Sequence, residues 1–154
     1  MTSENEIVIR REFDLPPDKL FSVWTDRKHL ENWLGPTSDI DVDLRPGGTW
    51  RCSMERPHDA GLRLRGVFTD IDRGERIVTT YELCDVGTGG PELPRGVVVT
   101  VLFHHIGEDR SVVNIRIAHP TADERQKHLA TGVVSLCEAK FHRLDEYLKD
   151  LREK

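Results

Sequence analysis

The 154-residue chain has 37% hydrophobic and 32% charged residues, a composition typical of a water-soluble globular protein that buries a core without metal or disulfide support. Its net charge of −5 argues against a nucleic-acid-binding surface, and it contains no apolar run long enough to span a bilayer. The polar, acidic residues 1–6 do not resemble a secretory signal. We therefore expect one domain over residues 1–154, located in the cytoplasm, with no nucleic-acid or membrane partner.

The cysteines and histidines do not suggest a metal centre. Cys52, Cys84 and Cys137 are odd in number, far apart and in no ligand spacing, which indicates reduced thiols in a reducing compartment. His128 and His142 lie fourteen residues apart in a predicted helix, too far to share a metal ion. We expect no metal and no cofactor.

The N-terminal third begins with a strand and two short helices. Residues 6–13 carry β-branched side chains in partial alternation and predict the strand. The first helix begins at Pro16-Pro17 and ends at Asp26, and the second is stopped by Gly35-Pro36. From there to Pro120 the pattern has period two, which predicts antiparallel strands with one wet face and one dry face.

A hairpin around residues 45–48 is the clearest local feature. Apolar residues and aspartates alternate over 39–44, and Arg45-Pro46-Gly47-Gly48 predicts a type II turn because proline presets its first central position and glycine supplies the positive φ of its second. The return strand places Trp50, Cys52 and Met54 on one face. The further strands are predicted over residues 62–69, 77–83, 97–106 and 111–119. Residues 86–96, rich in glycine and proline, predict an irregular loop and a candidate lid.

The last thirty or so residues predict one long amphipathic helix. Its apolar side chains recur in steps of three and four on one stripe: Leu129, Val133, Cys137, Phe141, Leu144, Leu148 and Leu151. Thr121 and Glu124 match a capping box at its start. Gly132 interrupts the stripe, either as a tolerated or closely packed position or as room for a ligand. A curved antiparallel sheet that grips this helix is the economical architecture.

Three ordered motifs resemble the family of activator of heat-shock-protein-90 ATPase homologues, within the START-like or SRPBCC superfamily. They comprise residues 16–36, residues 43–50 (Asp-Leu-Arg-Pro-Gly-Gly-Thr-Trp), and residues 66–71 with 76–78. The resemblance implies an α+β helix-grip fold, also called START-like or Bet v-like. In that fold a curved seven-stranded antiparallel sheet wraps around the long C-terminal helix, two short helices follow the first strand, and a cavity lies between sheet and helix.

Strand parity directs aromatic and polar side chains into that space. The candidate ligand-binding residues are Trp33, Trp50, Met54, Phe68, Tyr81, Phe103, His105, His119 and Val133. The rings and the methionine suit an apolar ligand, and Tyr81 or a histidine would fix its orientation. The same set also describes an ordinary packed core, in which both histidines are structural.

The first functional hypothesis is non-enzymatic binding of a small, largely apolar or aromatic ligand in the cavity. The resemblance also implies an alternative, a protein-interaction module with a chaperone or another protein as its partner. A second alternative is a cavity cyclase or hydrolase with His105, His119 and Tyr81 as acid–base groups. No catalytic motif is present, so the enzyme hypothesis is the least favoured. The sheet edge or the short helices offer surfaces for a homodimer.

Overall fold

The computed structural model describes residues 4–34, 39–56, 59–85 and 94–153, and the side chains of all of these except 54–56, 59–62, 84–85 and 152–153. The described part forms these elements in chain order: β1 (Glu6–Phe13), α1 (Pro17–Thr25), α2 (Arg27–Trp33), β2 (Asp41–Val42), β3 (Thr49–Arg56), β4 (Asp59–Asp72), β5 (Arg76–Asp85), β6 (Val97–Gly107), β7 (Arg110–Ala118), α3 (Ala122–Ala130) and α4 (Val133–Glu153). None of the described helices is both long enough and apolar enough to cross a membrane.

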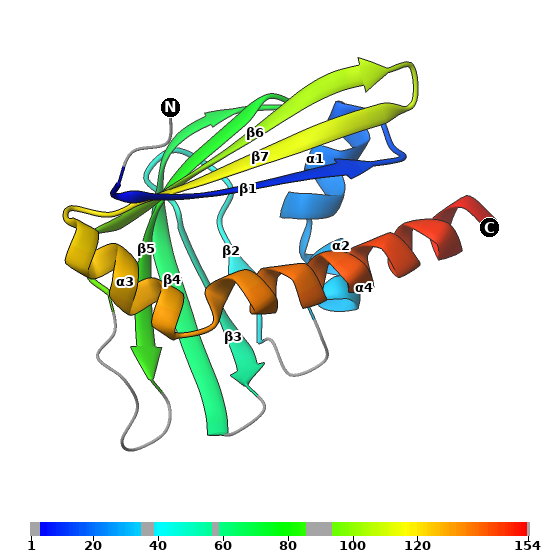
Figure 1. The fold of residues 1–154 in the computed structure, drawn as a ribbon. Coiled ribbons are helices and arrows are strands. Elements are labelled where there is room, and N and C mark those ends of the chain that lie inside the picture. The colour runs from blue at the N-terminus through cyan, green and yellow to red at the C-terminus, as the bar shows by residue number, and fades with distance from the viewer. Residues whose placement is uncertain (1–3, 35–38, 57–58, 86–93, 154) are drawn as a thin grey trace.

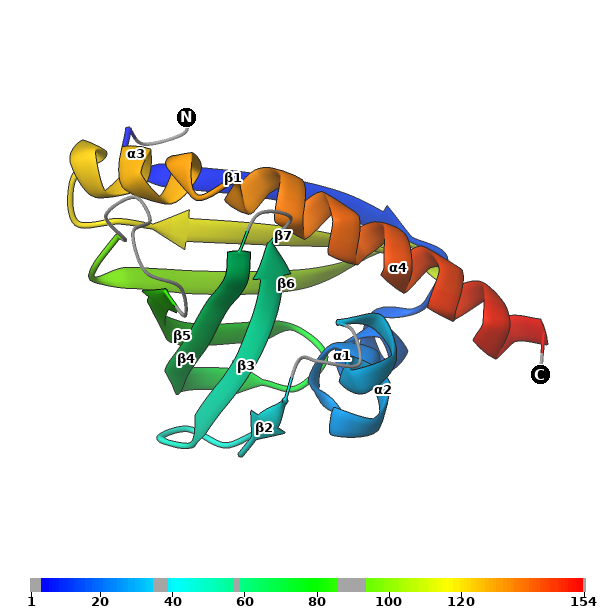
Figure 2. The same ribbon diagram turned by 90° about the horizontal axis from the view of Figure 1, so that it is seen from below.

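The strands form one antiparallel sheet in the order β1-β7-β6-β5-β4-β3-β2. Figures 1 and 2 show that β3 and β4 turn away from the direction of β6 and β7, so that the sheet curves, and that α4 runs across its concave side. Helices α1 and α2 cover one end of this side, where α2 contacts α4. The expected seven-stranded helix-grip fold is confirmed.

The predicted hairpin turn is present with the expected geometry. Gly47 has a φ of +83°, and the Gly48 amide donates a hydrogen bond of 2.8 Å to the Arg45 carbonyl. Strand β2 is shorter than the predicted 39–44, because regular pairing with β3 covers Asp41 and Val42 only. The backbone turns at both ends: Asp39 has a φ of +45°, and the Arg45 amide bonds the carbonyl two residues earlier.

The single C-terminal helix predicted from Thr121 is wrong, because the chain forms two helices. The predicted cap is present, since Thr121 Oγ1 accepts from the Glu124 amide at 3.2 Å. Helix α3 then ends, and Gly132 takes a φ of +81° while its amide bonds the Leu129 carbonyl at 3.1 Å. A Cβ built on Gly132 would meet no atom within 4 Å, which excludes close packing, and the positive φ assigns this glycine to a helix terminus.

An aromatic cluster at the edge of the core surrounds the indole of Trp24, a partly buried residue of α1. Its ring lies 5.2 Å from that of Trp33, 5.6 Å from Phe141 on α4, 5.8 Å from Phe103 on β6 and 6.4 Å from Phe13 on β1. Tilted and edge-on pairs of this kind contribute roughly 0.5–1.5 kcal/mol each beyond the burial of their area. This cluster joins α1, α2, α4 and the sheet at one end of the molecule.

Candidate ligand-binding site

A cavity of about 230 Å³, partly open to solvent, lies next to the aromatic cluster, between the concave face of the sheet and α4. Side chains of α2 and β2, including Leu30 and Val42, line the side nearest the short helices. All three tryptophans of the chain, Trp24, Trp33 and Trp50, contribute to its walls. The volume lies somewhat below the ~300–1,000 Å³ usual for drug-sized ligands, which matches a small molecule.

The wall formed by β3, β4 and β5 depends on a glycine. Trp50 pairs with Gly66 across the strands, and a Cβ on Gly66 would lie 2.5 Å from Trp50 Nε1 and overlap the Thr80 carbonyl oxygen. The missing side chain therefore lets the indole lie directly on β4. Trp50 Nε1 donates to Thr79 Oγ1 at 2.6 Å, and its ring lies 5.8 Å from that of Tyr81. Both contacts fix the ring in the cavity wall.

The polar groups on the walls include a phenol and two thiols. Burial raises the pKa of the Cys52 thiol to about 12 and that of Cys137 to about 11. Burial also raises the pKa of the Tyr81 phenol well above its usual range, and the two nearby thiols add to this effect. All three groups are therefore neutral at physiological pH and act as weak hydrogen-bonding groups rather than as nucleophiles or bases.

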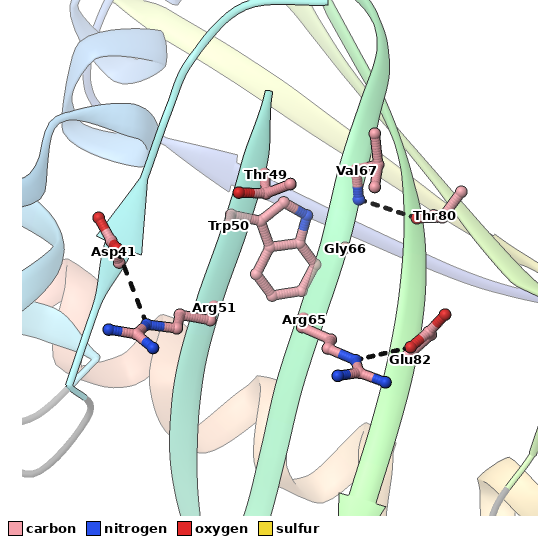
Figure 3. Close-up of a pocket in the computed structure, with 9 residues that line it drawn as sticks. All are labelled: Asp41, Thr49, Trp50, Arg51, Arg65, Gly66, Val67, Thr80 and Glu82. Atoms are coloured by element: carbon pink, nitrogen blue, oxygen red, sulfur yellow. Dashed lines mark hydrogen bonds and ion pairs between the residues drawn. The ribbon is translucent and has the colours of Figure 1, made fainter. Parts of the chain in front are cut away.

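A lysine of α4, Lys140, also belongs to the lining of the cavity. Lys140 Nζ is part-buried and donates a hydrogen bond of 2.6 Å to the carbonyl of Leu34, just beyond the end of α2. Arg51 also belongs to the lining, but its guanidinium extends along the outer face toward Asp41, 3.7 Å away (Figure 3). Among the described lining residues there is no aspartate, glutamate or histidine.

The predicted site residues are divided by the structure. Four of them line the cavity together: Trp33, Trp50, Phe68 and Tyr81. Phe103 and Val133 are buried in the core but do not line it, and Phe103 packs edge-on against Phe21 at 5.4 Å. The side chain of Met54, and residues 86–93 of the candidate lid, lie outside the described residues. A ligand-binding role for the first four stays a prediction.

The inward orientation predicted for His105 is wrong, because its side chain is exposed. Strand β6 continues past its last buried residue, Phe103, and its pairing with β7 stays regular as far as His105 and Ser111. Parity is therefore kept at His105, but it no longer indicates burial there. His119 is buried as predicted, with 5% of its surface exposed, but it does not line the cavity. The three groups named for acid–base chemistry, His105, His119 and Tyr81, therefore form no common site.

His119 instead forms a buried pair with His128 of α3. His119 Nδ1 bonds the carbonyl of Asn5 at 2.7 Å, and its Nε2 lies 2.9 Å from His128 Nδ1. A carbonyl only accepts, so His119 Nδ1 carries the proton, its Nε2 accepts in the neutral ring, and His128 Nδ1 donates. His128 Nε2 is then an unprotonated acceptor, and it has no hydrogen-bond partner among the described residues.

The histidine pair also contacts the cavity wall. The ring of His128, which is fully buried, lies 5.7 Å from the ring of Tyr81. Burial and, to a smaller extent, the neighbouring His119 together lower the pKa of His128 to about 4. His128 is therefore neutral at physiological pH. We interpret the pair as a structural element, in which the His128 ring packs against the Tyr81 ring.

The sequence reading missed the lining roles of Trp24 and Lys140 and the burial of His128. Lys140 follows Cys137, a stripe residue, by three positions, so helical geometry places the two on one face. That spacing was the signal available for Lys140. His119 and His128 lie on opposite sides of the connection between β7 and α3, and no spacing rule predicts their contact.

A second, wider groove of about 510 Å³ lies on the outer face of the sheet (Figure 3). Its polar lining includes two exposed ion pairs, Arg65–Glu82 at 2.7 Å and Arg51–Asp41 at 3.7 Å. The Trp50 indole between β3 and β4 is shared with the inner cavity. Exposed ion pairs contribute only ~0–1 kcal/mol each, so this groove is a solvated charged surface.

Comparison with known protein families identifies the family of this chain. The family model described as Activator of Hsp90 ATPase homolog 1-like protein matches residues 14–149. The chain belongs to this family. The match includes α1 and α2, β2 to β7, α3 and most of α4, and therefore all the described residues that line the cavity. A comparison with curated proteins finds no match.

Solved structures of similar fold come from bacteria and a protozoan. Protein Ms6760 from Mycobacterium smegmatis is 19% identical with a TM-score of 0.81, over 94% of this chain and 91% of its own. CalU16 from Micromonospora echinospora is 19% identical with a TM-score of 0.63, over 96% and 79%. PFC0360w, an HSP90 activator from Plasmodium falciparum, is 23% identical with a TM-score of 0.57, over 74% and 72%. At these identities the likeness shows the fold.

Proposed function

We propose that this protein binds a small, largely apolar or aromatic molecule in the cavity between the sheet and α4, without catalysing a reaction. The observation that supports this proposal is the cavity itself. A partly open space of about 230 Å³ with mostly apolar walls and a few polar groups has the character of a binding site for a small molecule.

Binding would be driven by removal of the ligand from water. Each Å² of apolar surface buried contributes about 25 cal/mol, and the aromatic walls offer further contacts to a ring. The neutral Tyr81 hydroxyl and the Cys52 and Cys137 thiols supply the few polar contacts that orient a ligand. Affinity in roughly the micromolar range is expected if the cavity exists before the ligand arrives.

Tryptophan fluorescence provides a direct test, because every tryptophan in the chain lines the cavity. A panel of uncharged aromatic and aliphatic compounds is titrated into the protein, and the emission and melting temperature are recorded. At least one compound should raise the melting temperature and change the emission.

Two substitutions on α4 make this test specific. Cys137→Phe places a ring in the cavity and should abolish both responses, whereas Ser135→Phe adds the same ring at an exposed position of the same helix and should preserve them. The proposal is rejected if no compound changes either signal in the unmodified protein. It is also rejected if Cys137→Phe, while folded, binds as well as Ser135→Phe.

A second candidate function is interaction with a chaperone, which the family membership supports. One surface feature favours it: Val67 and Val98 lie on either side of Thr80 on the outer face of the sheet, each more than one third exposed. The test is the ATP hydrolysis of Hsp90 with and without this protein. Stimulation that Val98→Asp abolishes would support this role, and no stimulation by the unmodified protein would exclude it.

A further inference from the structure

We infer that the ligand of the cavity carries an uncharged carbonyl group on its apolar or aromatic body, and that this group accepts a hydrogen bond from the Tyr81 hydroxyl. This inference rests on the proposed function and specifies the chemical class of its ligand. It derives from the hydrogen bonds that the polar groups of the cavity wall already make. Those bonds leave a neutral donor on the wall, and the described lining residues include no carboxylate.

Several indole and hydroxyl groups of the wall are already bonded within the protein. Trp33 Nε1 donates a hydrogen bond of 3.1 Å to the Val23 carbonyl. Trp50 Nε1 donates to Thr79 Oγ1 at 2.6 Å, and the Thr79 hydroxyl in turn donates to the Thr80 carbonyl at 2.8 Å. The N–H and O–H donors of these lining side chains therefore stabilise the wall itself and are not available to a ligand.

The Tyr81 hydroxyl differs from these groups, because it has no hydrogen-bond partner among the described residues. The tyrosine ring is held by contacts with the rings of Trp50 and His128, at 5.8 and 5.7 Å. The thiols of Cys52 on β3 and Cys137 on α4 both raise its pKa, so the phenol oxygen lies near a thiol of the sheet and a thiol of the helix. Because both thiols line the cavity, the hydroxyl faces the space between these two walls.

The state of the phenol determines which group it binds. Its raised pKa keeps it protonated at physiological pH, so the hydroxyl is a hydrogen-bond donor. A donor in an apolar space that lacks a partner costs free energy, and a carbonyl oxygen, which only accepts, removes this cost. A neutral carbonyl also enters an apolar space more readily than a charged group does. An apolar compound with one carbonyl group therefore complements this wall.

Acetophenone and α-methylstyrene provide the test, because the two compounds share a ring and a methyl group and differ only in C=O against C=CH₂. Isothermal titration calorimetry gives the dissociation constants of both for the unmodified protein and for Tyr81→Phe. Loss of the hydroxyl should weaken acetophenone binding about three- to tenfold and leave α-methylstyrene binding within about twofold. Each compound is compared with itself across two proteins, so the different hydration of the two compounds in water cancels.

Two further substitutions identify the donor. Tyr147→Phe removes the other tyrosine hydroxyl of the chain, which bonds His29 and does not line the cavity, and should change neither affinity. Trp24 also lines the cavity, and its N–H has no partner among the described residues. If Trp24→Phe selectively weakens acetophenone and Tyr81→Phe does not, the assignment to Tyr81 is wrong.

Carbon NMR of ¹³C-labelled acetophenone reports the hydrogen bond directly. The chemical shift of a carbonyl carbon increases when its oxygen accepts a hydrogen bond. The shift of the bound compound should therefore be higher in the unmodified protein than in Tyr81→Phe. It should also be higher in the unmodified protein than in cyclohexane, a comparison that needs no variant and remains decisive if Tyr81→Phe does not fold.

Each outcome decides between the two levels of the proposal. If Tyr81→Phe binds acetophenone as tightly as the unmodified protein, or weakens both compounds equally, the carbonyl ligand is wrong while binding in the cavity stands. The carbonyl ligand is also wrong if other compounds of the uncharged panel bind and acetophenone does not. If neither compound nor any member of the panel binds, the proposed function itself fails. A loss confined to acetophenone in Tyr81→Phe supports both.

Discussion

Acidification should destabilise this protein through His128. The pKa of this buried ring is about 4 in the folded chain, against an ordinary value of 6.5. A histidine whose pKa is lowered by folding stabilises the folded state at pH values above its pKa in the unfolded chain. The reason is that the unfolded chain binds the proton more readily as the pH falls. That contribution is complete above about pH 6.5 and is lost as the pH falls toward 4.

The size of the effect follows from the difference between 6.5 and about 4. At ~1.4 kcal/mol per pH unit, the loss amounts to about 3 kcal/mol by pH 4. This is a large share of the ~5–15 kcal/mol that usually stabilises a domain. With a urea dependence of ~2 kcal/mol per molar, it lowers the unfolding midpoint by roughly 1.5 M.

The variant that isolates this effect is His128→Asn. An asparagine amide can replace the donation from His128 Nδ1 to His119 Nε2, but it does not titrate. Urea unfolding of both proteins between pH 7.5 and 4 gives the free energy of unfolding as a function of pH. Ionisable groups away from His119 and His128 titrate alike in both, so the difference between the two curves reports the loss of His128 from this pair.

The curves should converge at low pH, since the variant loses about 3 kcal/mol less than the unmodified protein over this range. Parallel curves would refute the reasoning, because they would mean that His128 titrates similarly in the folded and unfolded chain. If the two curves instead moved apart toward acid pH, the effect of His128 protonation on stability would have the opposite sign. The pair would then be stabilised by protonation.

Two further predictions concern the cavity wall. Gly66→Ala should destabilise the fold by about 1–3 kcal/mol or more in urea unfolding, because the new methyl group overlaps a neighbouring strand and the Trp50 indole. The control is Gly107→Ala, where a Cβ has ordinary contacts and the stability should change much less. Equal effects of the two substitutions would contradict this account. In a Cys84→Ser background, Cys52 and Cys137 should react with iodoacetamide at pH 8 far more slowly in the folded protein than after unfolding. The reason is that burial keeps both thiols protonated. Rapid labelling of the folded protein would contradict the raised pKa values.

Much of the fold was predictable because its strands have one wet face and one dry face. Alternation specified β3 and β5, and the Arg45–Gly48 turn followed from proline and glycine at the two positions with special φ requirements. The break at Gly132 was missed because the apolar stripe continues on both sides of it. A spacing of side chains does not record the φ of the residue between them.

The site was less predictable than the fold. Parity placed Trp50, Phe68 and Tyr81 in the cavity wall, because inner-face residues of neighbouring strands converge where a sheet curves. Parity failed at His105, because β6 extends beyond its last buried residue, Phe103. Lys140 was overlooked because a charged residue beside an apolar stripe usually faces solvent, and only the approach of α2 brings a carbonyl to its ammonium group.

The pairing of the first strand with the last has a consequence for synthesis on the ribosome. Strand β1 ends at Phe13, and its partner β7 begins at Arg110, so about a hundred residues must be translated before the two can meet. At ~5–20 residues per second this takes about 5–20 s, during which β1 lacks the strand that it pairs with in the folded protein. The pairing of β1 with β7 is therefore a late step when the protein folds during its synthesis.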